Sequence, residues 1–219
     1  EHLLDFAGPD MPPEVAAVDG TWTLDLGALR GEGATGLARA SLALPPNIGR
    51  YEVRVLPDIT GVTLENDVTA GMVVGVQAEG RYVVGLRAFK VEEEGQPVLK
   101  RQLVLRWVDA ATGAESPVAV GEIMPYDGAA LTLEVETSLN GVSAAVTEDE
   151  GVGGFTAEAV HGTGGAPGLE VRGSGNVRAW FDDFKYWTVT GTQQGREYSY
   201  NNLNQLTQVT LDGETEEEY

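Results

Sequence analysis

The sequence predicts an all-β fold in which two antiparallel sheets pack face to face as a sandwich. Up to about Trp187, short apolar runs recur roughly every ten residues with turn residues between them, which is the spacing of sandwich strands. No segment keeps the period of an amphipathic helix. Many of the 29 glycines stand inside expected strands, where glycine marks bulges, bends or the close approach of another layer. We therefore expect a bent sandwich without long helices.

The first half of the chain contains the expected strands in a regular order. The first twenty residues hold three prolines and are expected to be irregular. The segment TWTLDLGAL places Trp22, Leu24 and Leu26 on one face. ARASLALP repeats that alternation until two prolines end it, because proline cannot donate to a strand ladder. YEVRVLP alternates apolar with charged residues, which predicts a strand with one face in solvent.

The second half continues with paired strands. AGMVVGVQAEGRYVVGLRAF predicts two strands joined near Glu79 and Gly80, and its low charge predicts burial on both faces. RQLVLRWVDAATGAESPVAVG supplies a strand, a loop at 109–113 and a returning strand. The hairpin LTLEVETSLNGVSAAVTED carries Asn140 and Gly141, a pair that tolerates positive φ in a two-residue turn. GLEVRGSG and NVRAWFDDFKYWTV complete the set.

Composition excludes several classes of function. With 14 lysine and arginine residues against 34 acidic residues and a formal charge of −20, the chain lacks the basic surface that nucleic acids or anionic membranes require. No stretch approaches the roughly 18 to 20 apolar residues of a membrane-spanning helix. The absence of cysteine excludes disulfides, thiolate metal sites and cysteine nucleophiles. EHLLDFAGPD lacks an initiator methionine and the regions of a signal peptide, so we expect a segment of a longer chain.

The order of these segments resembles the laminin G-like or concanavalin A-like jelly roll. The resemblance runs from Trp22 through YEVRV, AGMVVGV, RYVVGL and LTLEVETSLNGVSAAV to VRAWFDDFKYW, and covers roughly Asp5 to Val189. It implies two stacked antiparallel sheets, one of them concave, with a late FDDF strand returning beside the first. It further implies a module that binds glycans or protein partners, in some members hydrolyses glycans, and often holds a structural calcium ion.

The residues from Tyr198 onward are polar and rich in turns, and they predict a β-hairpin unit that needs stacked neighbours. This segment resembles one tyrosine-aspartate repeat of the Rhs and teneurin-like families, which implies a downstream repeat domain in the same polypeptide. The matching residues are Tyr198, Tyr200, Leu206, Val209 and Gly213, whereas Asn201, Asn204 and Gln205 replace the Asp, Gly and Arg of the pattern. We expect residues 1–190 to form the jelly-roll binding domain and residues 191–219 the linker and first repeat unit.

Trp180, Trp107 and Tyr126 are the candidate ligand-binding residues, because a flat aromatic face complements the CH groups of a sugar ring. Packing in the core is the commoner role of strand aromatics. Trp180 is the better candidate, because Phe181 is expected to take the inward position beside it.

Asp182 and Asp183 interrupt the alternation of VRAWFDDFKYW and predict a β-bulge. Together with Asp5 and backbone carbonyl groups, they would supply the oxygen ligands that calcium prefers. The resemblance also implies a structural Ca²⁺ ion. The alternative is an exposed bulge that binds nothing.

Glycoside hydrolysis is the enzyme activity that this fold would host most readily, and it requires two carboxylates about 5 to 9.5 Å apart. Glu134 and Glu136 share one face of LTLEVET, about 7 Å apart by strand rise, but they also fit the solvated side of an amphipathic strand. The acidic segments VEEEG and TEDEGVGG are interpreted as solvated loops. His2 and His161 are too few for a zinc site or a catalytic triad.

The sequence therefore predicts a non-catalytic binding module with a glycan or protein ligand, in a secreted or cell-surface bacterial protein. A glycoside hydrolase of the same fold and a structural spacer or cap of the repeats are the alternatives. A carboxylate pair in a closed cleft would favour the hydrolase, and a featureless face would favour the spacer.

Overall fold

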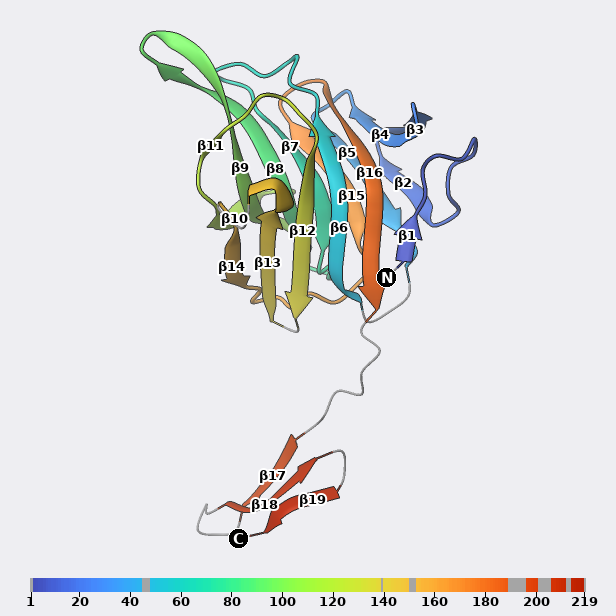
Figure 1. Ribbon diagram of the computed structural model, residues 1–219, viewed down its shortest axis with the longest axis vertical. Coiled ribbons are helices and arrows are strands. Elements are labelled where there is room, and N and C mark those ends of the chain that lie inside the picture. Colours follow the sequence, from blue (N-terminus) through green and yellow to red (C-terminus); the bar gives the residue numbers. More distant parts are fainter. Residues whose placement is uncertain are drawn as a thin grey trace. The chain divides into compact units, whose positions relative to one another are not determined.

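The computed structural model describes residues 2–44, 48–138, 140–149, 153–188, 196–200, 206–211 and 214–218. The chain divides into two compact units, Glu1–Thr188 and Val189–Tyr219. The first unit consists of two antiparallel sheets packed as a sandwich (Figure 1), which confirms the predicted fold class. We name these sheets A and B.

Sheet A has the strand order β14-β13-β12-β6-β16-β4-β3, with β1 paired to β16, and sheet B has the order β10-β9-β8-β7-β15-β5-β2, with β11 paired to β9. The strands of sheet A are β1 (His2–Leu4), β3 (Thr21–Asp25), β4 (Ala28–Gly33), β6 (Ile48–Pro57), β12 (Leu131–Ser138), β13 (Gly141–Val146), β14 (Phe155–Glu158) and β16 (Val177–Thr188). Those of sheet B are β2 (Val15–Asp19), β5 (Leu37–Leu42), β7 (Val68–Val74), β8 (Gly80–Glu93), β9 (Gln96–Asp109), β10 (Glu115–Val120), β11 (Met124–Pro125) and β15 (Gly168–Gly173). In each sheet a late strand, β16 or β15, lies between an early strand and a middle one.

The core lies between the sheets and is built from every second residue of each strand. Val53 and Val55 of β6 are fully buried, whereas the charged residues between and beside them face outward, as the period of two requires. Phe181 of β16 is fully buried and Trp180 beside it is half-buried, as the sequence predicted. Burial of a large apolar side chain stabilises the fold by about 1.5 to 3 kcal/mol.

Strands β7 and β8 are buried on both faces over most of their shared length, as expected from their low charge. Val73 and Val83 form, with Val108 of β9, a separate apolar cluster on the face of sheet B that points away from the core. Gly71 and Gly85 stand opposite each other in β7 and β8. A Cβ atom at Gly71 would lie 2.1 Å from a carbonyl oxygen of β8, so only glycine fits where these two backbones bend together.

Three local expectations are corrected. TWTLDLGAL is not one strand, because Leu26 and Gly27 have φ values of 54° and 84° and form the two-residue turn between β3 and β4. The first twenty residues are not irregular throughout, since β1 and β2 pair with β16 and β5. The β12–β13 hairpin is confirmed, but Gly141 pairs with Ser138 and belongs to β13 rather than to the turn.

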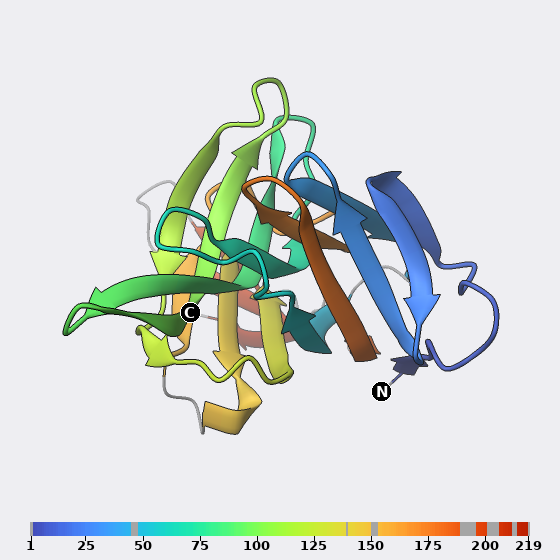
Figure 2. The same cartoon turned by 90° about the horizontal axis from the view of Figure 1, so that it is seen from above.

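The β8–β9 hairpin extends beyond the sandwich in both views (Figures 1 and 2). Its exposed tip contains Glu94 and Gly95, both with positive φ, so the acidic VEEEG segment is a solvated turn as expected. In the described part of the chain the only helix is the short 3₁₀ helix η1 (Thr147–Asp149). No helix in those ranges is long and apolar enough to cross a membrane.

The second unit contains a three-stranded antiparallel sheet in the order β17-β18-β19. Its strands are β17 (Arg196–Tyr200), β18 (Leu206–Leu211) and β19 (Glu214–Glu218). The sequence predicted a hairpin, and β19 adds a third strand to it. The turn expected at 201–204 lies outside the described residues, and membership of a tyrosine-aspartate repeat stays a prediction.

Candidate functional site

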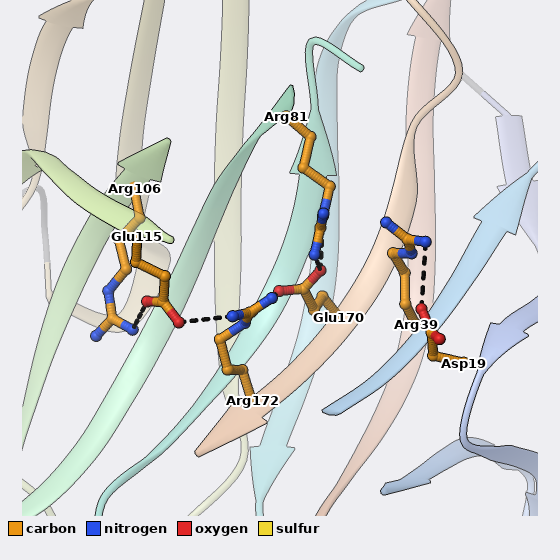
Figure 3. Close-up of polar contacts among 7 residues, drawn as sticks. All are labelled: Asp19, Arg39, Arg81, Arg106, Glu115, Glu170 and Arg172. Atoms are coloured by element: carbon orange, nitrogen blue, oxygen red, sulfur yellow. Dashed lines mark hydrogen bonds and ion pairs between the residues drawn. The ribbon is translucent and has the colours of Figure 1, made fainter. Parts of the chain in front are cut away.

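A continuous chain of ion pairs crosses the outer face of sheet B (Figure 3). It joins Arg106 of β9, Glu115 of β10, Arg172 and Glu170 of β15, and Arg81 of β8, and we call these five residues the arginine network. Glu115 accepts hydrogen bonds from Arg106 Nη1 at 2.8 Å and from Arg172 Nη1 at 2.7 Å. Glu170 accepts from the Nε atoms of Arg172 and Arg81, each at 2.9 Å. Each carboxylate thus lies between two guanidinium groups.

The alternation of side chains along each strand places the network on one face. In β15, Glu170 and Arg172 point outward, whereas Leu169 and Val171 belong to the core. In β8, Arg81 points outward beside core residues in the same way. None of these five residues was predicted from the sequence to form a site. The available signal was Arg81, a charge inside a strand expected to be buried on both faces, because a buried charge requires a partner.

The contact between Arg172 and Glu115 requires sheet B to be strongly curved. Strands β15 and β10 are separated by β7, β8 and β9 in the strand order. At about 4.8 Å per strand, a flat sheet would hold them about 19 Å apart, which is beyond the combined reach of the two side chains. Sheet B therefore bends toward its outer face, which is concave. We call it the concave face.

Burial and ion pairing oppose each other in the network. Burial is the largest influence on Glu115 and raises its pKa, but the hydrogen bonds and charges of Arg172 and Arg106 outweigh it, so the pKa is lowered. Burial is also the largest influence on Arg172 and lowers its pKa, but Glu170 and Glu115 outweigh it and the pKa is raised. Glu115 and Arg172 are therefore ionised at neutral pH.

The concave face gathers a large share of the arginines of this acidic chain. Beside the network, Arg39 pairs with Asp19 and Arg87 pairs with Asp67. Five of the eleven arginines thus face four carboxylates. These nine residues carry a combined charge of +1, although the whole chain carries −20.

Two groups of the concave face have no hydrogen-bond partner within the described part of the chain. Thr69 of β7 is 3% exposed, and its Oγ1 atom is buried and unpaired. It stands opposite Arg172 in the β15–β7 register. The Nε atom of Arg39 is also buried and unpaired. The face therefore has hydrogen-bonding capacity that the protein itself does not use.

The three aromatic residues predicted to bind a ligand do not share a surface. Trp180 lies half-buried on the outer face of sheet A, where its Nε1 donates to Asp25 Oδ2 at 3.0 Å. Trp107 packs against the core, and His161 stacks on its ring with centroids 4.0 Å apart. Tyr126 is 8% exposed, and burial, the largest influence, raises its pKa to about 12. Tyr126 is thus a buried core residue, which is the alternative considered for strand aromatics, and a ligand-binding role of Tyr126 or Trp107 stays a prediction. A ligand-binding role of Trp180 stays a prediction.

The outer face of sheet A has an open depression of about 450 Å³. It is lined by Glu134, Glu136, Ser143, Ala144, Ala145, Gly154, Phe155 and Thr156. Glu134 pairs with Arg50 at 2.7 Å, and Glu136 is exposed. The two glutamates therefore lie on an open, solvated surface and not in the closed cleft that would favour a hydrolase.

The bulge expected at Asp182 and Asp183 is confirmed. The register of β16 on β6 shifts after Asp182, and Asp183 has a φ of 48°. On the other side of β16, Leu4 of β1 stands opposite Phe184. Asp5, the next residue of the chain, therefore follows beside the bulge. This position would allow Asp5 and Asp183 to bind the same ion.

The fit of these acids to a calcium ion is partial. Asp5 Oδ1 accepts from the backbone N–H of Ala7, and Asp182 Oδ1 accepts from that of Asp183, each at 2.8 Å. The second oxygen of each carboxylate is left for another partner. The described residues contain no group of three or more His, Cys, Asp or Glu side chains that could hold a metal, so backbone carbonyls and water would have to complete the shell.

Comparison with known proteins identifies the class of fold. No family model matches the sequence, and no curated protein matches it. CBM66, a carbohydrate-binding module from Bacillus subtilis, superposes with a TM-score of 0.52 and 13% identity, over 80% of this chain and 96% of that one. A xylan β-1,4-xylosidase from Bacillus halodurans C-125 superposes with a TM-score of 0.57 and 14% identity, over 84% of this chain and 38% of that one. The Crh5 transglycosylase in complex with NAG superposes with a TM-score of 0.55 and 10% identity, over 91% of this chain and 87% of that one.

The first unit therefore has the jelly-roll sandwich found in carbohydrate-binding modules and in enzymes that act on glycans, as the sequence resemblance implied. Identities this low establish the shared fold alone. The function has to be argued from the side chains of this chain.

Proposed function

We propose that the unit Glu1–Thr188 is a non-catalytic glycan-binding module, and that its ligand binds on the concave face along the arginine network. The observation that carries this proposal is a row of charged donors and acceptors held in place by their own ion pairs. A site that is ordered before the ligand arrives loses less conformational entropy on binding.

The chemistry of the network suits a sugar. Neighbouring sugar hydroxyls both donate and accept, and guanidinium groups beside carboxylates offer both kinds of charge-assisted hydrogen bond. The side chains of Arg106, Arg172 and Glu115 are 20%, 18% and 29% exposed, so they are the members that a ligand would contact. The shared fold with a carbohydrate-binding module supports a glycan as the class of ligand.

Electrostatics favours binding over hydrolysis. A glycosidase needs one carboxylic acid that stays protonated near neutral pH, and therefore has a raised pKa. The pKa of Glu115 is lowered, and Glu170 is held between two guanidinium groups. Glu115 is therefore not suited to act as the general acid.

Replacing one arginine of the network tests the site. We expect a screen against an array of neutral and acidic glycans to identify ligands of the chain. Titration calorimetry then measures the Kd of each ligand. Arg106→Gln should weaken binding about tenfold or more, since a hydrogen bond to a charged group contributes about 1.5 to 3 kcal/mol. Arg50→Gln, on the outer face of sheet A, is the control and should leave Kd unchanged.

Two results would contradict the proposal. An Arg106→Gln chain that binds as tightly as the unaltered chain would exclude the network as the site. Release of reducing ends from a bound glycan would replace the binding function with hydrolysis.

We also propose that the module acts in a secreted or cell-surface bacterial protein, where a polysaccharide ligand would be met. The tail residues that resemble a tyrosine-aspartate repeat support a downstream repeat domain as its partner in the same polypeptide.

A structural calcium ion beside the β16 bulge is the remaining proposal from the sequence. We expect the chain to melt several degrees higher in millimolar calcium than in chelator at equal ionic strength, because an ion that binds only the folded state stabilises it by mass action. Asp183→Asn or Asp5→Asn should remove the difference, and Asp182→Asn tests the third acid. The control is Glu136→Gln, which lies on exposed β12. Equal melting temperatures in calcium and chelator would leave the bulge without an ion.

A further inference from the structure

Arg39 is the cation of the concave face that the protein neutralises least. It stands opposite Glu170 in the β5–β15 register, but both oxygens of Glu170 already accept hydrogen bonds from the network. Figure 3 shows Arg39 beside the network, joined by a dashed line to Asp19 alone. That pair has a distance of 3.2 Å, and the Asp19 side chain is 43% exposed. Water and salt therefore screen this ion pair.

The donors of Arg39 are largely unused. Its single ion pair employs Nη2, and its Nε atom is buried without a partner among the described residues. A guanidinium group binds a carboxylate best through two parallel N–H···O bonds, which add geometric selection to charge. On the same face, the buried Oγ1 of Thr69 is a second polar group without a partner. Both atoms are closed to solvent, so a ligand on this face would meet Arg39 through its Nη groups, in the exposed part of a side chain that is 27% exposed.

The charge distribution favours an anionic ligand at this place. A chain of −20 repels anions over most of its surface. The concave face, with five arginines and four carboxylates, has the opposite local sign. At physiological salt, charges are screened beyond about 8 Å, so a bound anion experiences mainly the local arginines. The acidic remainder of the chain would keep the anion from binding elsewhere.

We propose that the ligand is a carboxylated glycan, containing a uronic or a sialic acid, and that Arg39 binds its carboxylate while the arginine network contacts the sugar hydroxyls. This inference rests on the proposed glycan-binding function and names the chemical class of the ligand.

Two matched pairs of probes test the inference. Oligogalacturonate is compared with its methyl ester, which lacks the free carboxylates. Sialyllactose is compared with lactose, which lacks the sialic acid. Titration calorimetry is expected to show about tenfold or tighter binding of the acidic member of one pair, the size expected for a charge-assisted contact. Arg39→Gln should remove that difference. Arg39→Lys keeps the charge but not the planar fork, and should reduce the difference severalfold.

Arg30→Gln is the matched control. Arg30 lies on sheet A, is half-buried like Arg39, pairs with an aspartate at 3.2 Å, and also has an unpaired buried Nε. Its replacement should leave the preference for the acidic probe intact. Melting temperatures of the variants show whether each remains folded.

The outcomes separate the two proposals. If both members of each pair bind equally while Arg106→Gln still weakens binding, the carboxylate inference is overturned and the glycan-binding function stands. If the Arg39→Gln variant keeps the preference for the acidic probe, the carboxylate inference is also overturned. If no glycan of the array binds, both proposals fail.

Discussion

Replacing Glu170 with glutamine is expected to destabilise the sandwich by about 3 to 5 kcal/mol, because breaking a buried ion pair leaves an uncompensated charge in the interior. The Glu170 side chain has no exposed surface, and it pairs with both Arg81 and Arg172. Glutamine keeps the shape but removes the charge that balances these two guanidinium groups. Urea unfolding followed by tryptophan fluorescence measures the change in the free energy of unfolding.

The control for Glu170 is the same substitution at Glu136, which is exposed on β12 and should change the free energy of unfolding by less than about 0.5 kcal/mol. A loss below about 1 kcal/mol at Glu170 would mean that the network is hydrated and contributes little to the fold. The paired replacement of Arg81 and Glu170 should cost less than the sum of the single changes, because the two groups interact directly.

Gly71→Ala is expected to have an effect of similar size, about 3 kcal/mol or more. The added Cβ atom would lie 2.1 Å from the carbonyl oxygen of Val84 and 2.5 Å from the Cα atom of Gly85. Both contacts are with backbone, so no side-chain rotation can relieve them. Strands β7 and β8 would have to separate at this point. Thermal unfolding of the variant measures the loss.

Gly61→Ala is the matched control, because an added Cβ atom there meets nothing within 4 Å and the residue does not have positive φ. It is expected to be neutral or slightly stabilising, since alanine restricts the unfolded chain. Equal stability of the Gly71 and Gly61 variants would show that β7 and β8 can move apart at Gly71 at little cost.

The architecture of the sandwich could be predicted because it depends on patterns within single strands. Alternating residues in YEVRV and long uncharged runs in β7 and β8 indicate which faces are buried. The turn at Leu26 could not be found in this way. Leucine rarely takes positive φ, and the alternation of apolar residues continues through the turn without a break.

The candidate site could not be predicted because it depends on contacts between distant strands. Arg81 and Glu170 are 89 residues apart, and Arg172 and Glu115 are 57 residues apart. The contact between Arg172 and Glu115 also requires sheet B to curve, and curvature is not visible in the alternation of one strand. The aromatic residues were easier to find in the sequence, but Tyr126 shows that an aromatic side chain in a sheet protein is commonly used for the core.

The position of β15 and β16 between early and middle strands governs how this domain can assemble during synthesis. Within the described residues, strands β2 to β5 have ladder hydrogen bonds to the rest of the sandwich only through β15 in sheet B and β16 in sheet A. Before β15 and β16 have been synthesised, strands β2 to β5 and the strands from β6 to β14 form two separate sets, each with unpaired edges. Such edges are templates for wrong pairing with other chains, and joining them closes a loop of more than a hundred residues, which slows folding. The last strands of the sandwich to be synthesised thus complete both of its layers at once.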